Sequence, residues 1–503
     1  MSSRPLRLLI LMLYLLAIAG VLSFASLKRA ALAYGEVDFP FYAQFAARLS
    51  APHLSDTYAL QPRGYNFIGY VGIDGRDNLH QSIHLEPVKY VYALIYRIIP
   101  DPLAIVGFIA LVYFLPILYV AHIHPAERTQ DRLFILAFAL LYISIPSTVY
   151  MVTHDLRPRI LLIPAFALAL LAVHYQRPLR EKLLLFGLLF LVREEALLFG
   201  TIILLYHTLH TPPGPERTRT TVAFGLLWLG FVLITSVYFL WTGYETDPVY
   251  QPFHLFLTQR RLYRGLAISG SVVAVLLFAW GWFHARKRPW LREILQILAY
   301  TTGFIPLLVQ LATMLPDWLL ADAPSNREMV DRFLYSPNTT MLFVAALLLL
   351  MLIRNSLKAP NGLTALQTVF LLLGLGFLSL QLTHLAATVA DYTERANQAA
   401  IIRPLRAETD PYTSRILADY HTYQAFFDYE HILVYQRFPW QIAGDARYYP
   451  DNLPYLQRSL HDTIDIIVIH AENRPVIQEL LNAVALQPLR VVENETFQII
   501  YLR

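Results

Sequence analysis

The chain has 503 residues, of which 56% are hydrophobic and only 15% are charged. This composition is too apolar for a water-soluble protein of this size, and it excludes disordered, collagen-like and coiled-coil chains. The net charge of +4 argues against nucleic acid as a partner, and the absence of cysteine excludes disulfides, thiolate catalysis and cysteine metal sites. We therefore expect an integral membrane protein that crosses the bilayer many times.

Apolar runs of the length that a membrane helix needs recur along the chain. A hydrocarbon core of about 30 Å requires roughly 20 apolar residues in a helix. Such runs cover residues 6–27, 102–122, 133–152, 159–174, 183–208, 222–241, 266–283, 292–315, 337–353 and 364–387. The prediction is an all-α, polytopic transmembrane domain over residues 1–389, followed by a small outer domain over residues 390–503.

The run 183–208 is unusual because Arg193, Glu194 and Glu195 stand at its middle. Ionisable groups at the bilayer centre are costly unless they are paired or hydrated. If this run crossed the membrane once, the later basic loops would lie outside, although short cytoplasmic loops normally carry the Lys and Arg. Two short helices that meet at these residues on the outer side restore the rule. We therefore expect about eleven spans in the inner cell membrane, with a cytoplasmic N-terminus and an extracytoplasmic C-terminal domain.

Two soluble parts are expected on the outer side. The first loop, residues 28–101, contains two amphipathic stretches, 41–49 and 88–99, whose apolar spacing predicts interfacial helices. The C-terminal part reads as a small α/β domain. Its expected elements are a buried strand over 465–469, a helix over 474–485, and strands over 489–492 and 497–502 joined by a hairpin turn over 493–496.

The first candidate site is a pair of carboxylates, Glu36 and Asp38, directly after the first span. Such a pair could bind a divalent cation, act as a general base towards a hydroxyl, or hold a sugar. Asp38 before Phe39-Pro40 is equally a favourable helix N-cap. The spacing alone leaves the catalytic and the capping interpretations open.

His80, His84 and Glu86 follow in the same loop. Their spacing resembles a set of metal ligands, but it also resembles an ordinary polar turn, which is the stronger interpretation. Arg193, Glu194 and Glu195 at the hairpin tip indicate a functional site, because ionisable groups at membrane depth usually serve a function. A structural ion pair is its alternative interpretation.

Two arginine-rich clusters complete the candidate site. Arg157 and Arg159 beside Asp155 could grip a phosphate through paired hydrogen bonds, or could pair with that carboxylate and anchor the helix at the interface. Arg260 and Arg261 could meet an anionic headgroup or serve as interfacial anchors. If the topology is right, all clusters share one outer layer that suits a lipid-phosphate substrate.

These motifs resemble those of the GT-C superfamily of integral-membrane glycosyltransferases and, more closely, a related bacterial membrane-protein family of unknown function. Residues 36–38 are similar to the acidic Glu-x-Asp motif, residues 84–87 to a His-x-x-Pro motif, and residues 192–195 to a Val-Lys-Glu-Asp motif. Residues 155–159 depart from an Asp-Phe-His-Pro-Glu motif, because arginines replace its His and Glu. This departure argues against a metal at that cluster.

The resemblance implies transfer of a hexosyl or pentosyl group from a polyprenyl-phosphate carrier to an acceptor on the outer face. Asp38 would be the catalytic base, with Glu36 beside it. The residues expected to bind the sugar or the lipid phosphate are His84, Glu86, Asp155, Arg157, Arg159, Arg193, Glu194, Glu195, Arg260 and Arg261. No cofactor is required, although a divalent cation is compatible, and the outer domain would help to bind the acceptor.

Two other functions compete with the enzyme. A transporter or flippase of a lipid-linked or anionic substrate would use the buried Arg and Glu as coupling or substrate sites. Transporters usually contain internal repeats with matching broken spans, and the sequence contains no such repeat. A non-catalytic assembly or anchoring protein is the third interpretation, in which Glu36 and Asp38 merely cap a helix.

Overall fold

The computed structural model describes residues 3–34, 38–50, 85–144, 156–193, 196–242, 360–419, 421–429, 431–435, 460 and 464–503. The chain forms two compact units. Unit 1 comprises residues 1–17, 112–151 and 159–380, and unit 2 comprises residues 18–111, 152–158 and 381–503.

Three of the described helices are long and apolar enough to cross a membrane. They are α1 (Ser3–Ala30), α6 (Pro102–Ile123) and the first part of α12 (Pro215–Thr242). These helices confirm an integral membrane protein. The expected runs at 133–152 and 159–174 correspond to the shorter helices α7 (Thr129–Ser144) and α9 (Leu162–His174), and 364–387 lies within α19 (Pro360–Ala399). The runs at 266–283, 292–315 and 337–353 lie outside the described residues, so the number of eleven spans stays a prediction.

The run 183–208 is not one helix. Helix α10 (Leu179–Phe190) and helix α11 (Ala196–His210) are separated at the charged residues. A straight helix would place residues 190 and 200 about 15 Å apart, yet a Cβ on Gly200 would lie only 2.9 Å from Cζ of Phe190. The chain therefore reverses between the two helices. The predicted reversal is confirmed, whereas the side of the membrane on which its tip lies stays a prediction.

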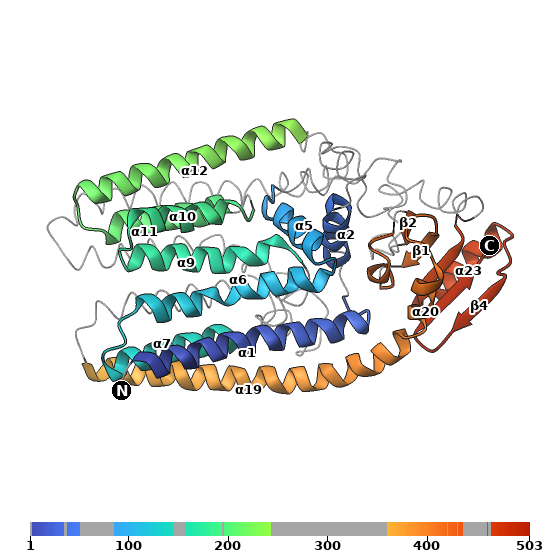
Figure 1. Ribbon diagram of the computed structural model, residues 1–503, viewed down its shortest axis with the longest axis horizontal. Helices are drawn as coiled ribbons and strands as arrows, with labels where there is room; N and C mark the ends of the chain where they lie inside the picture. Colours follow the sequence, from blue (N-terminus) through green and yellow to red (C-terminus); the bar gives the residue numbers. More distant parts are fainter. Residues whose placement is uncertain are drawn as a thin grey trace, which may run out of the picture. The chain divides into compact units, whose positions relative to one another are not determined.

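Helices α9 to α12 lie side by side in unit 1 (Figure 1). Phe166 of α9 packs on Phe199 of α11 with ring centroids 5.2 Å apart. At the other end of the same pair, Nδ1 of His174 lies 2.7 Å from the hydroxyl of Tyr206. Helices α9 and α11 therefore run in the same direction, and the antiparallel α10 brings the hairpin tip to the end at which α9 begins.

Gly200 allows the two arms of the hairpin to approach closely. We expect Gly200→Ala to destabilise the protein by about 1–3 kcal/mol, because the added methyl group overpacks against the Phe190 ring. Gly187→Ala is the matched control, since nothing lies within 4 Å of a Cβ at that position. Thermal unfolding of both variants in lipid measures the difference. Equal melting temperatures would contradict the close packing.

Helices form at both amphipathic stretches of the first loop, within unit 2, whereas their interfacial position stays a prediction. They are α2 (Asp38–Ser50) and α5 (Val88–Ile98), which pack against each other. The hydroxyl of Ser50 donates a hydrogen bond to the carbonyl of Ala93 over 2.8 Å and ties the end of α2 to α5. Helix α5 buries one face, which includes Val88, Tyr92 and Tyr96, as its spacing predicts. Helix α2 instead buries the five consecutive residues 42–46, which lie on all sides of the helix.

The C-terminal domain contains a five-stranded mixed sheet in the order β2-β1-β3-β5-β4. The strands are β1 (Arg415–Asp419), β2 (His431–Tyr435), β3 (Ile466–His470), β4 (Arg490–Glu493) and β5 (Phe497–Tyr501), and the helices are α20 (Ile402–Glu408) and α23 (Arg474–Ala483). Strand β1 pairs in parallel with β2 and β3, whereas β5 pairs antiparallel with β3 and β4. The predicted elements β3, β4, β5 and α23 are confirmed, but β1 and β2 were not expected.

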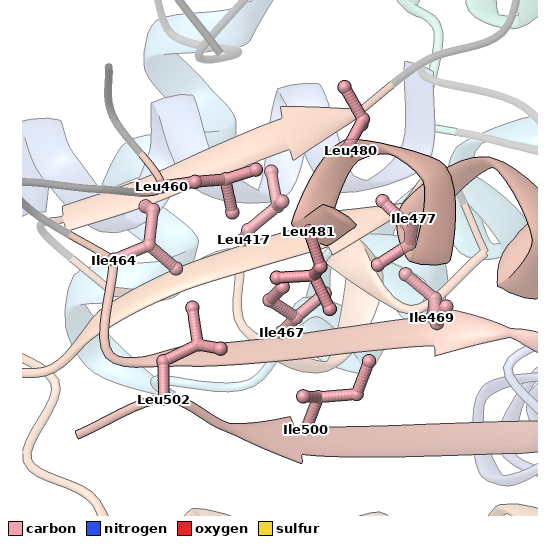
Figure 2. Close-up of a cluster of buried hydrophobic side chains, with 10 residues drawn as sticks. All are labelled: Leu417, Leu460, Ile464, Ile467, Ile469, Ile477, Leu480, Leu481, Ile500 and Leu502. Atoms are coloured by element: carbon pink, nitrogen blue, oxygen red, sulfur yellow. The ribbon is translucent and has the colours of Figure 1, made fainter. Parts of the chain in front are cut away.

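One face of this sheet is covered by α23. Leu417, Ile467 and Ile500 stand opposite one another on β1, β3 and β5, and alternate residues of a strand share a face. Figure 2 shows the buried cluster that these side chains form with Ile477 and Leu481 of α23. Full burial of each such side chain contributes about 1.5–3 kcal/mol. The cluster fixes the sheet and therefore the loops at its edges.

Candidate functional site

Asp38 stands at the start of α2, shortly after the end of α1. Two backbone hydrogen bonds close the C-terminal end of α1. The N–H of Ala33 donates to the carbonyl of Lys28, and the N–H of Leu32 donates to the carbonyl of Arg29. Leu32 has a φ of 49° there, in the left-handed region that closes many helices. The chain is thereby turned towards Tyr34, whose ring stacks on Phe39 with centroids 3.6 Å apart. Two anchored aromatic residues therefore bracket the segment that contains Asp38.

Residues of α19 and of the C-terminal domain contact the chain on both sides of Asp38. The side-chain oxygen of Gln424 accepts a hydrogen bond from the backbone N–H of Tyr34, and its amide nitrogen donates to the Tyr34 carbonyl, both over 3.3 Å. The hydroxyl of Tyr423 donates to Oε1 of Gln44 in α2 over 2.7 Å. Arg395 of α19 donates to the Leu32 carbonyl over 3.3 Å. Residues distant in sequence thus set the position of α2.

Glu86 is buried between α2 and α5, with only 1% of its surface exposed. The hydroxyl of Tyr42 donates a hydrogen bond to its Oε2 over 2.8 Å. A buried carboxylate held in this way links the two helices of the first loop. Its expected part in substrate binding stays a prediction.

Arg157 and Arg159 flank the start of the short 3₁₀ helix η1 (Pro158–Leu161) that leads into α9. They alternate with the buried residues Leu156, Pro158 and Ile160, and both are partly exposed. Arg193 lies just after α10 at the hairpin tip and is 8% exposed. Arg159 and Arg193 therefore lie at the same end of the α9, α10 and α11 layer in unit 1, whereas Asp38, Glu86 and Arg157 belong to unit 2.

The remaining predicted site residues lie outside the described part of the chain. They are Glu36, His80, His84, Asp155, Glu194, Glu195, Arg260 and Arg261. The backbone of Asp38 is described, and its helix start agrees with the capping interpretation without excluding the catalytic one.

A second polar cluster, not anticipated from the sequence, lies at the edge of the C-terminal sheet. His421, His470 and Glu472 bring one possible metal-ligand atom each within 4.8 Å of one another. Burial and the neighbouring His421 lower the pKa of His470. The buried strand 465–469 was predicted, and a histidine directly after such a strand was the available signal.

Two solved structures resemble this chain. A crystal structure of ArnT from Cupriavidus metallidurans bound to undecaprenyl phosphate matches 97% of this chain and 98% of that chain, with a TM-score of 0.45 and 13% identity. The apo structure of that protein matches 97% of each chain, with a TM-score of 0.42 and 13% identity. No family model and no curated protein matches the sequence, so the functional proposal rests on the residues of this chain.

Proposed function

We propose that the protein is an integral-membrane glycosyltransferase that moves a sugar from a polyprenyl-phosphate carrier to an acceptor on the outer face. The observation that supports this proposal is the anchoring of the segment around Asp38. Stacking of Tyr34 on Phe39 and the two hydrogen bonds between Tyr34 and Gln424 hold that segment between a membrane helix and the C-terminal domain. A lipid-linked donor and a water-soluble acceptor would meet at such a boundary.

Asp38 would act as the general base. An ionised carboxylate is favoured at the start of a helix, because the first N–H groups carry partial positive charge. It would take the proton of the acceptor hydroxyl as the hydroxyl oxygen forms a bond to the anomeric carbon. The bond between that carbon and the phosphate oxygen would break on the opposite side. A single displacement of this kind inverts the anomeric configuration.

The leaving lipid phosphate would need positive charge. Arg159 and Arg193 lie at one end of the α9, α10 and α11 layer, and guanidinium groups can bind phosphate oxygens with two hydrogen bonds. Fixed donors that stabilise charge formed in the transition state lower the barrier. Arg157, Arg260 and Arg261 are the further proposed phosphate ligands, and Glu36, Glu194 and Glu195 would orient the sugar or the arginines.

The proposal predicts sugar transfer by the purified protein in lipid nanodiscs. A panel of radiolabelled polyprenyl-phosphate sugars, each tested with membrane-derived acceptors, should include at least one donor that is consumed with release of polyprenyl phosphate. The soluble nucleotide sugars serve as controls and should not be consumed. Movement of intact lipid-linked sugar from one leaflet to the other in sealed vesicles, without transfer of the sugar to an acceptor, would instead identify a flippase.

A further inference from the structure

The parallel strands β1 and β3 end beside each other, and their last residues begin a separate polar site. Strand β2 lies on one side of β1, whereas β3 lies on the other. The connections from β1 to β2 and from β2 to β3 therefore lead to opposite sides of β1, which makes the place between β1 and β3 a topological switch point. In open α/β sheets, ligands bind at the carboxyl ends of the strands at such a point. His421 follows β1, His470 ends β3, and Glu472 is two residues further on.

The three side chains converge there. Nε2 of His421 lies 2.9 Å from Oε1 of Glu472. Nδ1 of His470 lies 3.7 Å from the same oxygen, and the two imidazole rings are 4.9 Å apart. All three side chains keep access to solvent, with 24%, 20% and 58% of the side chain of His421, His470 and Glu472 exposed. A small ion could therefore reach them from water.

The backbone beneath the cluster is fixed by the fully buried Asp419. One carboxylate oxygen accepts hydrogen bonds from the N–H groups of His421 and Thr422 and from the Thr422 hydroxyl. The other oxygen accepts from the N–H of His470 and the side-chain amide of Asn473. Mutation of the groups that hold metal ligands in place typically lowers the affinity for the metal 10–100-fold. The loops that carry the two histidines are thus preorganised relative to each other.

We propose that His421, His470 and Glu472 bind a divalent cation of the zinc type. Two imidazole nitrogens and one carboxylate oxygen are a donor set that suits zinc. Three protein ligands leave one of the four tetrahedral positions for water or for an anionic group of another molecule. The cation would replace the hydrogen bond between Nε2 of His421 and Oε1 of Glu472, and small rotations of the side chains would bring the ligands to bonding distance.

The cation would also brace the contact between the outer domain and α2. His421 directly precedes the turn that contains Tyr423 and Gln424, which bind Gln44 and Tyr34. The carbonyl of His421 also accepts a hydrogen bond from the Gln424 amide over 2.7 Å. Zinc should therefore raise the melting temperature of the whole chain. This inference does not depend on the proposed sugar transfer.

Zinc binding can be measured on the full chain, purified with a tag that contains no histidine, stripped with a chelator and placed in nanodiscs. Calorimetry should find a single zinc ion per chain, and cobalt should give the absorption bands of a four-coordinate site. His421→Gln and His470→Asn should abolish both signals. These variants keep polar groups for the existing hydrogen bonds, because glutamine can still donate to Glu472 and asparagine can still cap η5 (Ala471–Asn473) as His470 does.

Glu472→Gln should weaken zinc binding at least tenfold. Glu479→Gln is the matched control, because Glu479 is an exposed carboxylate on α23 of the same domain, and it should bind like the wild type. The proposal is overturned if the wild type binds no zinc or gives no cobalt bands. It is also overturned if the histidine variants, still folded by circular dichroism, bind as tightly as the wild type.

Discussion

Replacing Asp38 with asparagine is expected to lower the rate of sugar transfer by about 10²–10⁴-fold, which is the usual contribution of a general base. The fold should survive, because asparagine caps a helix start as well as aspartate does. The rate of transfer with the donor found in the panel is the measurement, made at saturating donor and acceptor. Circular dichroism and the melting temperature should be unchanged.

Asp101→Asn provides a matched control for this change. Asp101 also stands at a helix start, where its carboxylate accepts a hydrogen bond from the N–H of Leu103 over 2.8 Å. Its ion pair with Arg29 is partly exposed, and such pairs contribute little to stability. The control should therefore transfer sugar at the wild-type rate. If Asp38→Asn also did so, Asp38 would be only a helix cap, and the base would have to be sought elsewhere.

Local patterns predicted the elements that depend on local physics. The spacing of apolar residues predicted α2, α5 and α23. The cost of burying Arg193 and its neighbours predicted the break between α10 and α11, which the contact between Phe190 and Gly200 confirms. In each case, the sequence within about 15 residues contains the decisive information.

The sequence did not predict the features that depend on distant pairing. The apolar runs within β1 and β2 cover only residues 416–418 and 432–434, and so short a run does not reveal its partners. The bond between Tyr34 and Gln424 joins residues 390 positions apart. The cluster of His421 and His470 likewise forms only because β1 and β3 are neighbours in the sheet. The position of His470 directly after a predicted strand is a local signal for one histidine, but no local pattern shows that His421 lies beside it.

These distant contacts change what the C-terminal domain is expected to do. The sequence suggested that it helps to bind the acceptor. In unit 2, however, Gln424, Tyr423 and Arg395 contact the end of α1 and the helix α2. A domain that fixes the segment before a catalytic base affects the rate even if it never touches a substrate, because small displacements of a reacting group are costly.

Asp419→Asn should therefore loosen the edge of the C-terminal sheet at which β1 and β3 end. The variant replaces one oxygen of a fully buried carboxylate with an amide nitrogen. If the remaining oxygen faces His421 and Thr422, the new N–H₂ group faces two other donors, the N–H of His470 and the amide of Asn473. Buried donors left without acceptors cost about 1–3 kcal/mol each. We expect a loss of roughly 2–4 kcal/mol in the stability of this edge of the sheet.

Hydrogen exchange of the full chain in nanodiscs measures this loss locally. At 1.4 kcal/mol per tenfold change, the amides of β1 and β3 should exchange roughly 30-fold to several-hundred-fold faster in the variant. Asp410→Asn is the control, because Asp410 is exposed in the same domain and accepts a bond from the N–H of Tyr412 over 2.9 Å. Exchange of the Tyr34 amide should also accelerate in Asp419→Asn. Its N–H donates to Gln424, which lies in the turn that directly follows the residues held by Asp419. Unchanged protection of β3 would show that the buried carboxylate does not hold the loops together.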